Sequence, residues 1–292
     1  MSCVIHDSSF TVREGDVLSS ASSKYVVECF LGEGSFGKAD KRQLVSFMGC
    51  FFDGPLICLE YELLDRSLYN VTQASPHGYL PLPTIRYIME QLAQALLFLT
   101  EAGIIHMDLK PENIMVRGQE VKVIDFGSAC NAAHCNLAEY HQSLPYRAPE
   151  VMLGLPATCS ADMWSLGCIL AELVQGSMLY PGVKEYHIWQ SILKTHEALF
   201  QSTEEYGEAG KPHPSASSSL DNVVKVGNVS DDPRAASITD LMKRMLQLDP
   251  NLRISPREML NHPFIYQDRP AQLVQPKNRC PKPRVDSSDT DC

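Results

Sequence analysis

A short hairpin bordered by polar side chains constrains this chain more than any other feature. Residues 114–116 and 121–124 are apolar runs, and residues 117–119 supply the turn between them. Four polar residues border the hairpin at the end opposite its turn: Asp108, Lys110, Asn113 and Asp125. Carboxylate and amide oxygens suit Mg²⁺, and a lysine suits a phosphate. The sequence therefore predicts that these four side chains converge on a site for a metal and a phosphate.

Three motifs around this hairpin resemble those of the protein kinases. Residues 106–113, His-Met-Asp-Leu-Lys-Pro-Glu-Asn, resemble the catalytic loop. Residues 125–127, Asp-Phe-Gly, resemble the metal-binding triplet, and residues 148–150, Ala-Pro-Glu, resemble the end of the activation segment. Their order and spacing make the resemblance specific, and it extends from about Tyr25 to Ile265.

Within the kinases, the chain most resembles the homeodomain-interacting protein kinases, and the dual-specificity tyrosine-regulated kinases are close relatives. Three segments carry this finer resemblance: 124–129, 146–150 and 154–156. It implies an α+β fold with a β-rich N-lobe and a mainly α-helical C-lobe. The expected divisions are a flexible lead-in at 1–24, a truncated N-lobe with hinge at 25–64, a C-lobe at 65–266 with a flexible insert at 201–236, and a disordered tail at 267–292.

Hydrophobic patterning predicts the main elements of both lobes. Strands are expected at 25–31, 43–52 and 56–61, the last two paired as a hairpin, and helices at 84–101, 161–175, 184–200, 238–248 and 256–260. Five apolar residues recur at three- and four-residue spacing in the first of these helices: Ile85, Ile88, Leu92, Leu96 and Leu99. This stripe predicts a helix packed against the core.

The N-lobe is too short for a complete kinase. Its glycine loop, Gly-Glu-Gly-Ser-Phe-Gly at 32–37, follows a strand, which favours a loop that covers phosphates. Only fifteen residues, 38–52, separate this loop from the turn at 53–54. They cannot hold the third strand with its phosphate-anchoring lysine and also the helix whose glutamate pairs with it. Lys38 and Lys41 lack the expected strand context, and solvated charge is the default interpretation.

By resemblance, the hairpin site transfers the γ-phosphoryl group of ATP to a protein hydroxyl. Asp108 would accept or orient the hydroxyl proton, and Lys110 would neutralise the moving phosphoryl group. Asn113 and Asp125 would hold Mg²⁺ across the phosphates. Residues 59–64 resemble the hinge that receives adenine, with Tyr61 at the gatekeeper position. The implied nucleotide-binding positions are Gly32, Gly34, Gly37, Glu62, Leu64 and Met115.

Other positions match structural or regulatory residues of the family. The implied structural residues are His106, Glu150, Asp162 and Arg253. Asp162 would hold the backbone of the catalytic loop, although it could also simply cap its helix. Tyr140 aligns with a tyrosine that these families phosphorylate on themselves; the alternative is an exposed tyrosine with no role. Arg147 is the expected phosphate partner, but Leu144 and Pro145 depart from the family pattern.

Two functions remain open from the sequence. The first is a protein serine/threonine kinase using ATP and Mg²⁺, with dual specificity through self-phosphorylation of Tyr140. The second is a catalytically impaired kinase-like scaffold that lacks the phosphate-anchoring lysine. The expected partners are protein substrates, including transcription regulators by resemblance. Kinases of the resembled group often accept a proline after the target residue. The resemblance also implies an intracellular protein of the nucleus, the cytoplasm or both.

Charge and composition exclude several other classes. The net charge of −10 and the pI near 5.4 argue against a nucleic-acid binder. No stretch reaches the roughly 18 apolar residues of a membrane span, and no secretory signal is visible. We therefore expect the ten cysteines to be thiols. Cys130, His134 and Cys135 form the nearest approach to a zinc site, but no second pair follows them.

Overall fold

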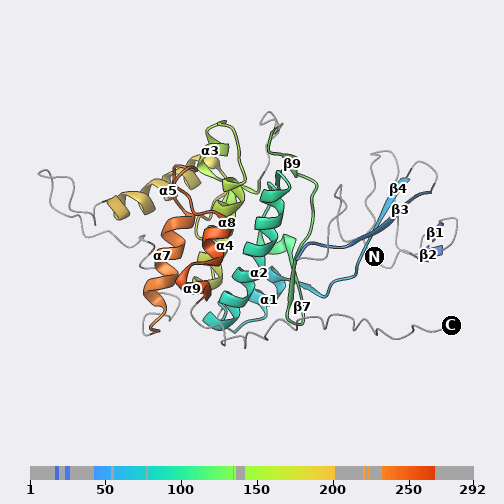
Figure 1. Cartoon of the computed structure of the whole chain (residues 1–292), viewed down its shortest axis with the longest axis horizontal. Helices are drawn as coiled ribbons and strands as arrows, with labels where there is room; N and C mark the ends of the chain where they lie inside the picture. The colour runs from blue at the N-terminus through green and yellow to red at the C-terminus, as the bar shows by residue number, and fades with distance from the viewer. Residues whose placement is uncertain are drawn as a thin grey trace, which may run out of the picture.

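The structure of the 292-residue chain is a computed structural model that describes residues 17–19, 24–26, 43–53, 56–76, 78–133, 135, 142–200, 220, 223 and 232–266. It has a small sheet-containing N-terminal part and a larger helical part (Figure 1), which confirms the predicted α+β class. Among the described residues, no helix combines the length and the apolar character needed to cross a membrane.

Two antiparallel strand pairs make up the N-terminal part. Strand β1 (Val17–Ser19) pairs with β2 (Lys24–Val26), and β3 (Phe47–Asp53) pairs with β4 (Leu56–Tyr61). The β3–β4 ribbon projects away from the helices, with the β1–β2 pair beside it (Figure 1). The predicted hairpin of 43–52 with 56–61 is confirmed, whereas the predicted strand at 25–31 is described only at its start.

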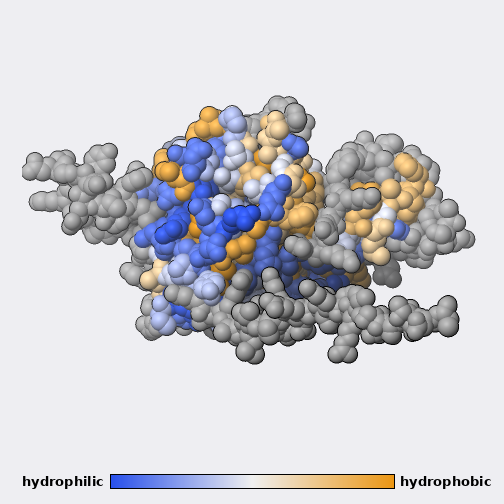
Figure 2. All heavy atoms as spheres, in the orientation of Figure 1, coloured by the Kyte–Doolittle hydropathy of each residue, from blue (hydrophilic) through white to orange (hydrophobic). Residues whose placement is uncertain are grey.

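Hydrophobic side chains lie on the surface of the β3–β4 ribbon (Figure 2). Met48 is 71% exposed and Phe52 is 69% exposed. In a complete β-rich lobe, further strands and a helix would cover such side chains. Their exposure fits the shortened sequence between the glycine loop and this ribbon.

Strand β3 begins at Phe47, four residues later than predicted. Gln43 has a φ of +59°, a left-handed backbone conformation that an extended strand does not contain. Leu44 instead forms a parallel bridge with Val123, and the N–H of Val123 donates to the carbonyl of Gln43 over 2.8 Å. Because Leu44 is only 1% exposed, this segment fastens the ribbon to the large lobe before β3 starts.

The large lobe consists of helices around one core, to which β5 (Arg66–Ser67), β7 (Ile114–Arg117) and β8 (Glu120–Val123) add a small sheet. Its helices are α1 (Leu68–Gln73), α2 (Leu82–Glu101), α3 (Pro149–Met152), α4 (Ser160–Gln175), α5 (Glu185–Phe200), α7 (Ala235–Met245), α8 (Pro256–Leu260) and α9 (Pro263–Tyr266), with 3₁₀ turns η1 (Pro111–Asn113) and η2 (Leu144–Tyr146). Helix α4 packs against both α2 and α7, and α2 also packs against α8 (Figure 1). Almost every residue of α4 is buried, which confirms the prediction for 161–175.

The predicted stripe on α2 is confirmed, because each of its five residues is at most 4% exposed. The helix starts at Leu82, two residues before its predicted start, because a proline in the first turn needs no hydrogen-bonded N–H. Helix α7 likewise starts at Ala235 rather than Ile238 and ends at Met245. The prediction followed the apolar residues and missed the alanines that precede them.

Two small sheets carry the loops of the expected site. Strand β5 (Arg66–Ser67) pairs with β7 (Ile114–Arg117), which pairs with β8 (Glu120–Val123), as the sequence predicted for this hairpin. Strand β6 (Ile104–Ile105) pairs with β9 (Cys130–Asn131). The catalytic-loop residues connect β6 to β7, and the metal-binding triplet lies between β8 and β9. Both loops therefore connect the same two sheets, β6–β9 and β5–β7–β8.

The other predicted divisions are only partly described. Most of the expected insert at 201–236, most of the lead-in and the whole tail lie outside the described residues. Within the insert, Leu220 and Val223 are buried in the core of the large lobe. These two positions belong to the packed lobe rather than to a solvated linker.

Candidate active site

Three of the four polar residues that the sequence predicts to converge are joined by hydrogen bonds centred on Asp108. The Nζ of Lys110 donates to Oδ2 of Asp108 over 2.7 Å. The side-chain amide of Asn113 donates to the same Oδ2 over 3.2 Å and to the main-chain oxygen of Asp108 over 2.9 Å. The Asp108 side chain is 15% exposed, so it is screened from water but open on one side.

Ser143 joins this cluster from a distant part of the sequence. Its hydroxyl and its N–H donate to Oδ1 of Asp108 over 2.7 and 3.0 Å, and its hydroxyl accepts from Lys110 over 3.0 Å. The sequence analysis did not select Ser143. The signal available was its position near the end of the activation segment, seven residues before Glu150.

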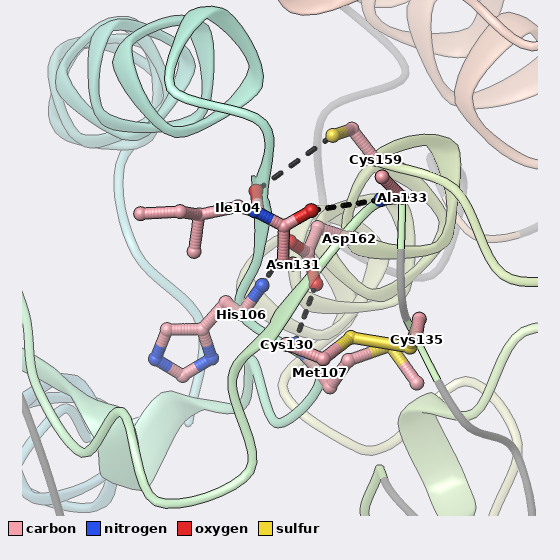
Figure 3. The surroundings of a disulfide bond; sticks show 9 residues. All are labelled: Ile104, His106, Met107, Cys130, Asn131, Ala133, Cys135, Cys159 and Asp162. Atoms are coloured by element: carbon pink, nitrogen blue, oxygen red, sulfur yellow. Dashed lines mark hydrogen bonds between the residues drawn. A yellow bond between two sulfur atoms is a disulfide. The ribbon is translucent and has the colours of Figure 1, made fainter.

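Asp162 fixes the backbone of the catalytic loop. Its carboxylate accepts from the N–H groups of His106 and Met107 over 2.7 and 3.0 Å (Figure 3). Burial raises the pKa of Asp162, and the charge of His106 and these two hydrogen bonds oppose that rise. Met107 has a φ of +63°, so the two bonds hold a left-handed backbone at the start of the loop. The alternative of a simple cap is wrong, because α4 starts after Cys159 without a side-chain cap.

His106 ties the catalytic loop to the metal-binding triplet. Its Nε2 donates to the carbonyl of Ile124 over 2.9 Å, and its ring packs edge-on against Phe126 with centroids 4.9 Å apart. The N–H of Ile124 in turn donates to the carbonyl of Asn113 over 2.9 Å. Asp125, which follows Ile124 directly, has a φ of +59°, and its Oδ1 accepts from Gly127. The expected metal ligands therefore lie on two loops that are hydrogen-bonded to each other.

Tyr61, which the resemblance places at the gatekeeper position, is coupled electrostatically to this triplet. Burial raises the pKa of Tyr61, and the carboxylate of Asp125 adds to that rise. The ring of Tyr61 also packs edge-on against Phe47, with centroids 5.7 Å apart. The end of β4 therefore lies within electrostatic range of Asp125.

Glu62, in the segment expected to be the hinge, is fixed by contacts from both lobes. Its N–H donates to the carbonyl of Ser46 over 3.1 Å, and its carboxylate accepts from the N–H of Ser46 over 2.8 Å. The same carboxylate forms ion pairs with Lys122 and with Arg117. Burial would raise the pKa of Glu62, but the bonds from Lys122 and Ser46 bring it below its usual range. The sequence analysis did not select Lys122, which lies on β8.

Leu64 and Met115 are half-buried at the lobe boundary and on β7, respectively. Their contact with adenine stays a prediction. Gly32, Gly34 and Gly37 lie outside the described residues, as do Lys38 and Lys41.

A buried glutamine organises the end of the activation segment. Gln142 is 5% exposed, and its side chain accepts from the N–H of Ala148 over 2.9 Å and donates to the hydroxyl of Ser165 over 3.2 Å. Its φ is +74°, and its main-chain oxygen accepts from Nε and Nη2 of Arg147 over 3.2 and 2.8 Å. Nη1 of Arg147 lies 3.5 Å from the carboxylate of Glu185. Tyr140 lies outside the described residues, so the expected partnership with Arg147 stays a prediction.

The predicted pair of Glu150 and Arg253 is present and buried. Nη1 and Nη2 of Arg253 donate to the two carboxylate oxygens of Glu150 over 2.7 and 2.9 Å. The guanidinium also donates to the carbonyls of Ser160 and Gln247, and it lies 5.3 Å from the ring centroid of Trp164. This bidentate pair fastens α3 to the segment before α8.

The ring of Trp164 also stacks on His196, and this gives a pH-dependent prediction. Burial and the charge of Arg253 lower the pKa of His196 to about 4. Because an unfolded histidine binds its proton near pH 6.5, stability is complete above that pH and falls as the pH drops toward 4. Replacing His196 by Phe keeps the stacked ring and removes this loss. Wild type should therefore lose about 2 kcal/mol relative to His196→Phe between pH 7 and pH 5.

Urea unfolding at both pH values measures this difference. His187→Phe, on an exposed position of the same helix, is the matched control and should follow the wild type. An equal pH dependence in the wild type and in His196→Phe would show that His196 does not titrate in this range.

The expectation that all cysteines are thiols is wrong at one place. Cys130 and Cys135 form a disulfide, with their Cα atoms 5.4 Å apart (Figure 3). After Cys130, the N–H of Ala133 donates to Oδ1 of Asn131, and the N–H of Ala132 donates to the carbonyl of Gly103. The zinc alternative is also wrong, since the disulfide uses both thiols. Within the described part of the chain, the cysteines at 50, 58, 159 and 168 form no disulfide.

Comparisons with known proteins agree with the geometry. The protein kinase domain family matches residues 34–265. The chain is 36% identical over 273 residues to homeodomain-interacting protein kinase 2 from Mesocricetus auratus, a match that covers 78% of this chain and 23% of that protein. It is 33% identical over 280 residues to homeodomain-interacting protein kinase 4 from Mus musculus, covering 77% of this chain and 46% of the relative. It is 33% identical over 247 residues to the DYRK-family kinase pom1 from Schizosaccharomyces pombe, covering 77% of this chain and 22% of that kinase.

The first match also fits a shortened chain. The alignment is 273 residues long, but it covers 78% of this chain, which is about 228 of its 292 residues. About 45 positions of the alignment therefore have no residue in this chain. The chain spans about a quarter of the length of this relative. The family match covers most of the chain, including the catalytic loop, the metal-binding triplet and the Glu150–Arg253 pair. The chain therefore belongs to the protein kinase family, with homeodomain-interacting and DYRK-family kinases among its relatives.

Proposed function

We propose that this chain is a protein serine/threonine kinase that transfers the γ-phosphoryl group of ATP to a protein hydroxyl. The observation that carries the proposal is the position of Asp108. Its carboxylate is in hydrogen-bond contact with Lys110, Asn113 and Ser143, on a loop whose backbone a buried aspartate fixes. Such a carboxylate is preorganised to accept or orient a proton.

Each polar residue of the cluster has a role in this proposal. Asp108 takes up or orients the proton of the attacking hydroxyl, and Lys110 neutralises charge on the phosphoryl group as it moves. The hydroxyl of Ser143 bonds to both side chains, so it holds them at a fixed separation while substrate enters. Positioning and charge stabilisation supply most of the catalysis in this reaction class.

The residues present suit Mg²⁺ bound to the phosphates of ATP. The amide nitrogen of Asn113 donates to Asp108, so the amide oxygen is the atom left for a cation. Asp125 adds a carboxylate from the neighbouring loop. Mg²⁺ takes one or two protein oxygens together with phosphate oxygens and water, and when bound it neutralises phosphate charge. Hinge residues Glu62 and Leu64, with Met115, are the proposed adenine contacts.

The shortened N-lobe supports a second candidate, a kinase-like scaffold with impaired catalysis. The fifteen residues between the glycine loop and the turn at 53–54 leave no room for the strand and helix that anchor the phosphates. Loss of one well-placed electrostatic donor lowers a rate by about 10²–10³. The presence of Asp108, Asn113 and Asp125 favours the enzyme. The short segment between the glycine loop and the turn at 53–54 favours the scaffold.

Calorimetric titration of the purified chain with Mg·ATP separates the two candidates. We expect binding that Asp125→Asn reduces at least about tenfold, because a carboxylate is lost from the proposed metal site. Glu120→Gln, on an exposed residue at the far end of the hairpin, is the control and should bind as wild type does. Absence of binding at millimolar ATP would contradict the kinase and leave the scaffold.

The end of the activation segment suits proline after the phosphorylated residue. The carbonyl of Gln142 is bonded to Arg147 and is therefore not available to a substrate N–H. A peptide N–H left without an acceptor costs about 1–3 kcal/mol, and proline has no N–H to lose. This geometry supports the proline preference that the resemblance implied.

Protein substrates follow from the proposed activity. The name of the homeodomain-interacting relatives supports transcription regulators as substrates and the nucleus as a site of action. Self-phosphorylation of Tyr140 belongs to the same proposal, and phosphopeptide mapping after incubation with Mg·ATP tests it. Phosphate on serine or threonine alone would exclude dual specificity.

A further inference from the structure

An ion pair connects the end of the activation segment to the start of α5. Nη1 of Arg147 lies 3.5 Å from Oε1 of Glu185, the first residue of the helix. The Arg147 side chain is 11% exposed and that of Glu185 is 41% exposed, so the pair lies at the rim of the segment. The 3₁₀ turn η2, just before Arg147, also packs against α5.

The other edge of the same guanidinium holds the carbonyl of Gln142. Nε and Nη2 of Arg147 both donate to that oxygen. A guanidinium is planar and rigid, so a contact at Nη1 restricts the direction in which Nε and Nη2 point. Glu185 therefore acts on Gln142 through Arg147, without touching it.

The direction of the Gln142 carbonyl decides whether the N–H of the substrate residue after the phosphorylated one finds an acceptor. Gln142 has a φ of +74°, a conformation that a residue other than glycine rarely adopts, so it needs external support. Its side-chain bonds to Ala148 and Ser165 hold one side of the residue, and Arg147 holds its carbonyl. If the guanidinium rotates away, the carbonyl is free to turn toward a substrate N–H.

We propose that Glu185 is a positioning residue that sets how strictly the site requires proline after the phosphorylated hydroxyl. The proposal rests on the kinase activity proposed above and deepens it. A negative residue at the first position of α5 also fits the positive end of the helix, which holds the carboxylate near Arg147. Glu185 touches neither substrate nor cofactor in this role.

The test compares two peptides that differ only in proline or alanine after the target serine. Wild type should favour the proline peptide in kcat/KM by about 5- to 150-fold, the range of one unpaired peptide N–H. Glu185→Gln should lower this ratio about two- to fivefold, as expected for one partly exposed ion pair. The change should come from faster phosphorylation of the alanine peptide, with the proline peptide little altered.

Lys184→Gln is the matched control, because Lys184 is the exposed neighbour of Glu185 and should leave the ratio unchanged. An unchanged ratio in Glu185→Gln would overturn the proposal. An equal loss with both peptides would also overturn it, since that is the result of general structural damage.

Hydrogen exchange makes the proposal testable even without catalysis. Glu185→Gln should speed exchange of the amides at 142–148 about two- to fivefold, and Lys184→Gln should not. If wild type phosphorylates neither peptide, the proposed kinase activity is contradicted. The hydrogen-exchange rates alone then test the positioning role of Glu185. Equal exchange in both variants and wild type would overturn the positioning role whatever the activity.

Discussion

Asp108→Asn is expected to lower ATP-dependent phosphorylation of a serine–proline peptide by at least about 10²–10⁴-fold. Asparagine keeps the size of the side chain and can still bond to Ser143. It cannot accept the hydroxyl proton as a carboxylate does, and it loses the charge that holds the Nζ of Lys110 at 2.7 Å. Initial rates of phosphate incorporation at saturating Mg·ATP measure the effect.

Two comparisons make this result specific to the chemistry. Calorimetry should show that Asp108→Asn binds Mg·ATP within about threefold of wild type, because the metal ligands proposed here are Asn113 and Asp125. Glu120→Gln, far from the loop, should keep the wild-type rate. Incorporation that survives in Asp108→Asn would show that Asp108 is not the proton acceptor.

Glu150→Ala is expected to destabilise the large lobe by about 3–5 kcal/mol. The Arg253 side chain is 0% exposed and that of Glu150 is 2% exposed, so removal of the carboxylate leaves a buried charge without its partner. Bonds from Arg253 to main-chain oxygens remain, but they carry no full negative charge. The total stability of a domain is about 5–15 kcal/mol, so a shift of this size is large in urea unfolding.

A double-mutant cycle separates the pair from its surroundings. Arg253→Met alone leaves Glu150 unpaired, whereas Glu150→Ala with Arg253→Met removes both charges. The double variant should therefore lose less stability than the sum of the two single variants. Glu101→Ala breaks an exposed pair with Arg257 and is the control, with no measurable loss expected. Additive losses in the cycle would contradict direct coupling of Glu150 with Arg253.

The sequence predicted the helices and strands whose formation depends on residues close together in the chain. The hairpin of β7 and β8 followed from two apolar runs around a turn, and the buried face of α2 followed from the spacing of its apolar residues. Errors arose where a distant segment overrode the local pattern. The strand expected from Gln43 starts at Phe47, because Leu44 pairs with Val123 on the large lobe.

The kinase family, the catalytic loop and the missing part of the N-lobe were determined by the sequence itself. Each of these conclusions depends on which residues occur and how far apart they lie within one continuous stretch of the chain, and both can be read from the sequence. Only the tertiary structure brought Ser143 to Asp108 and Glu185 to Arg147, and only it showed that Cys130 and Cys135 are bonded to each other. Hydrogen bonds, ion pairs and disulfides act over a few ångströms, and a polar side chain in a loop carries no periodic signal of its partner. The turn η2, which follows Ser143 and precedes Arg147, packs against α4 and α5, and this packing places both residues.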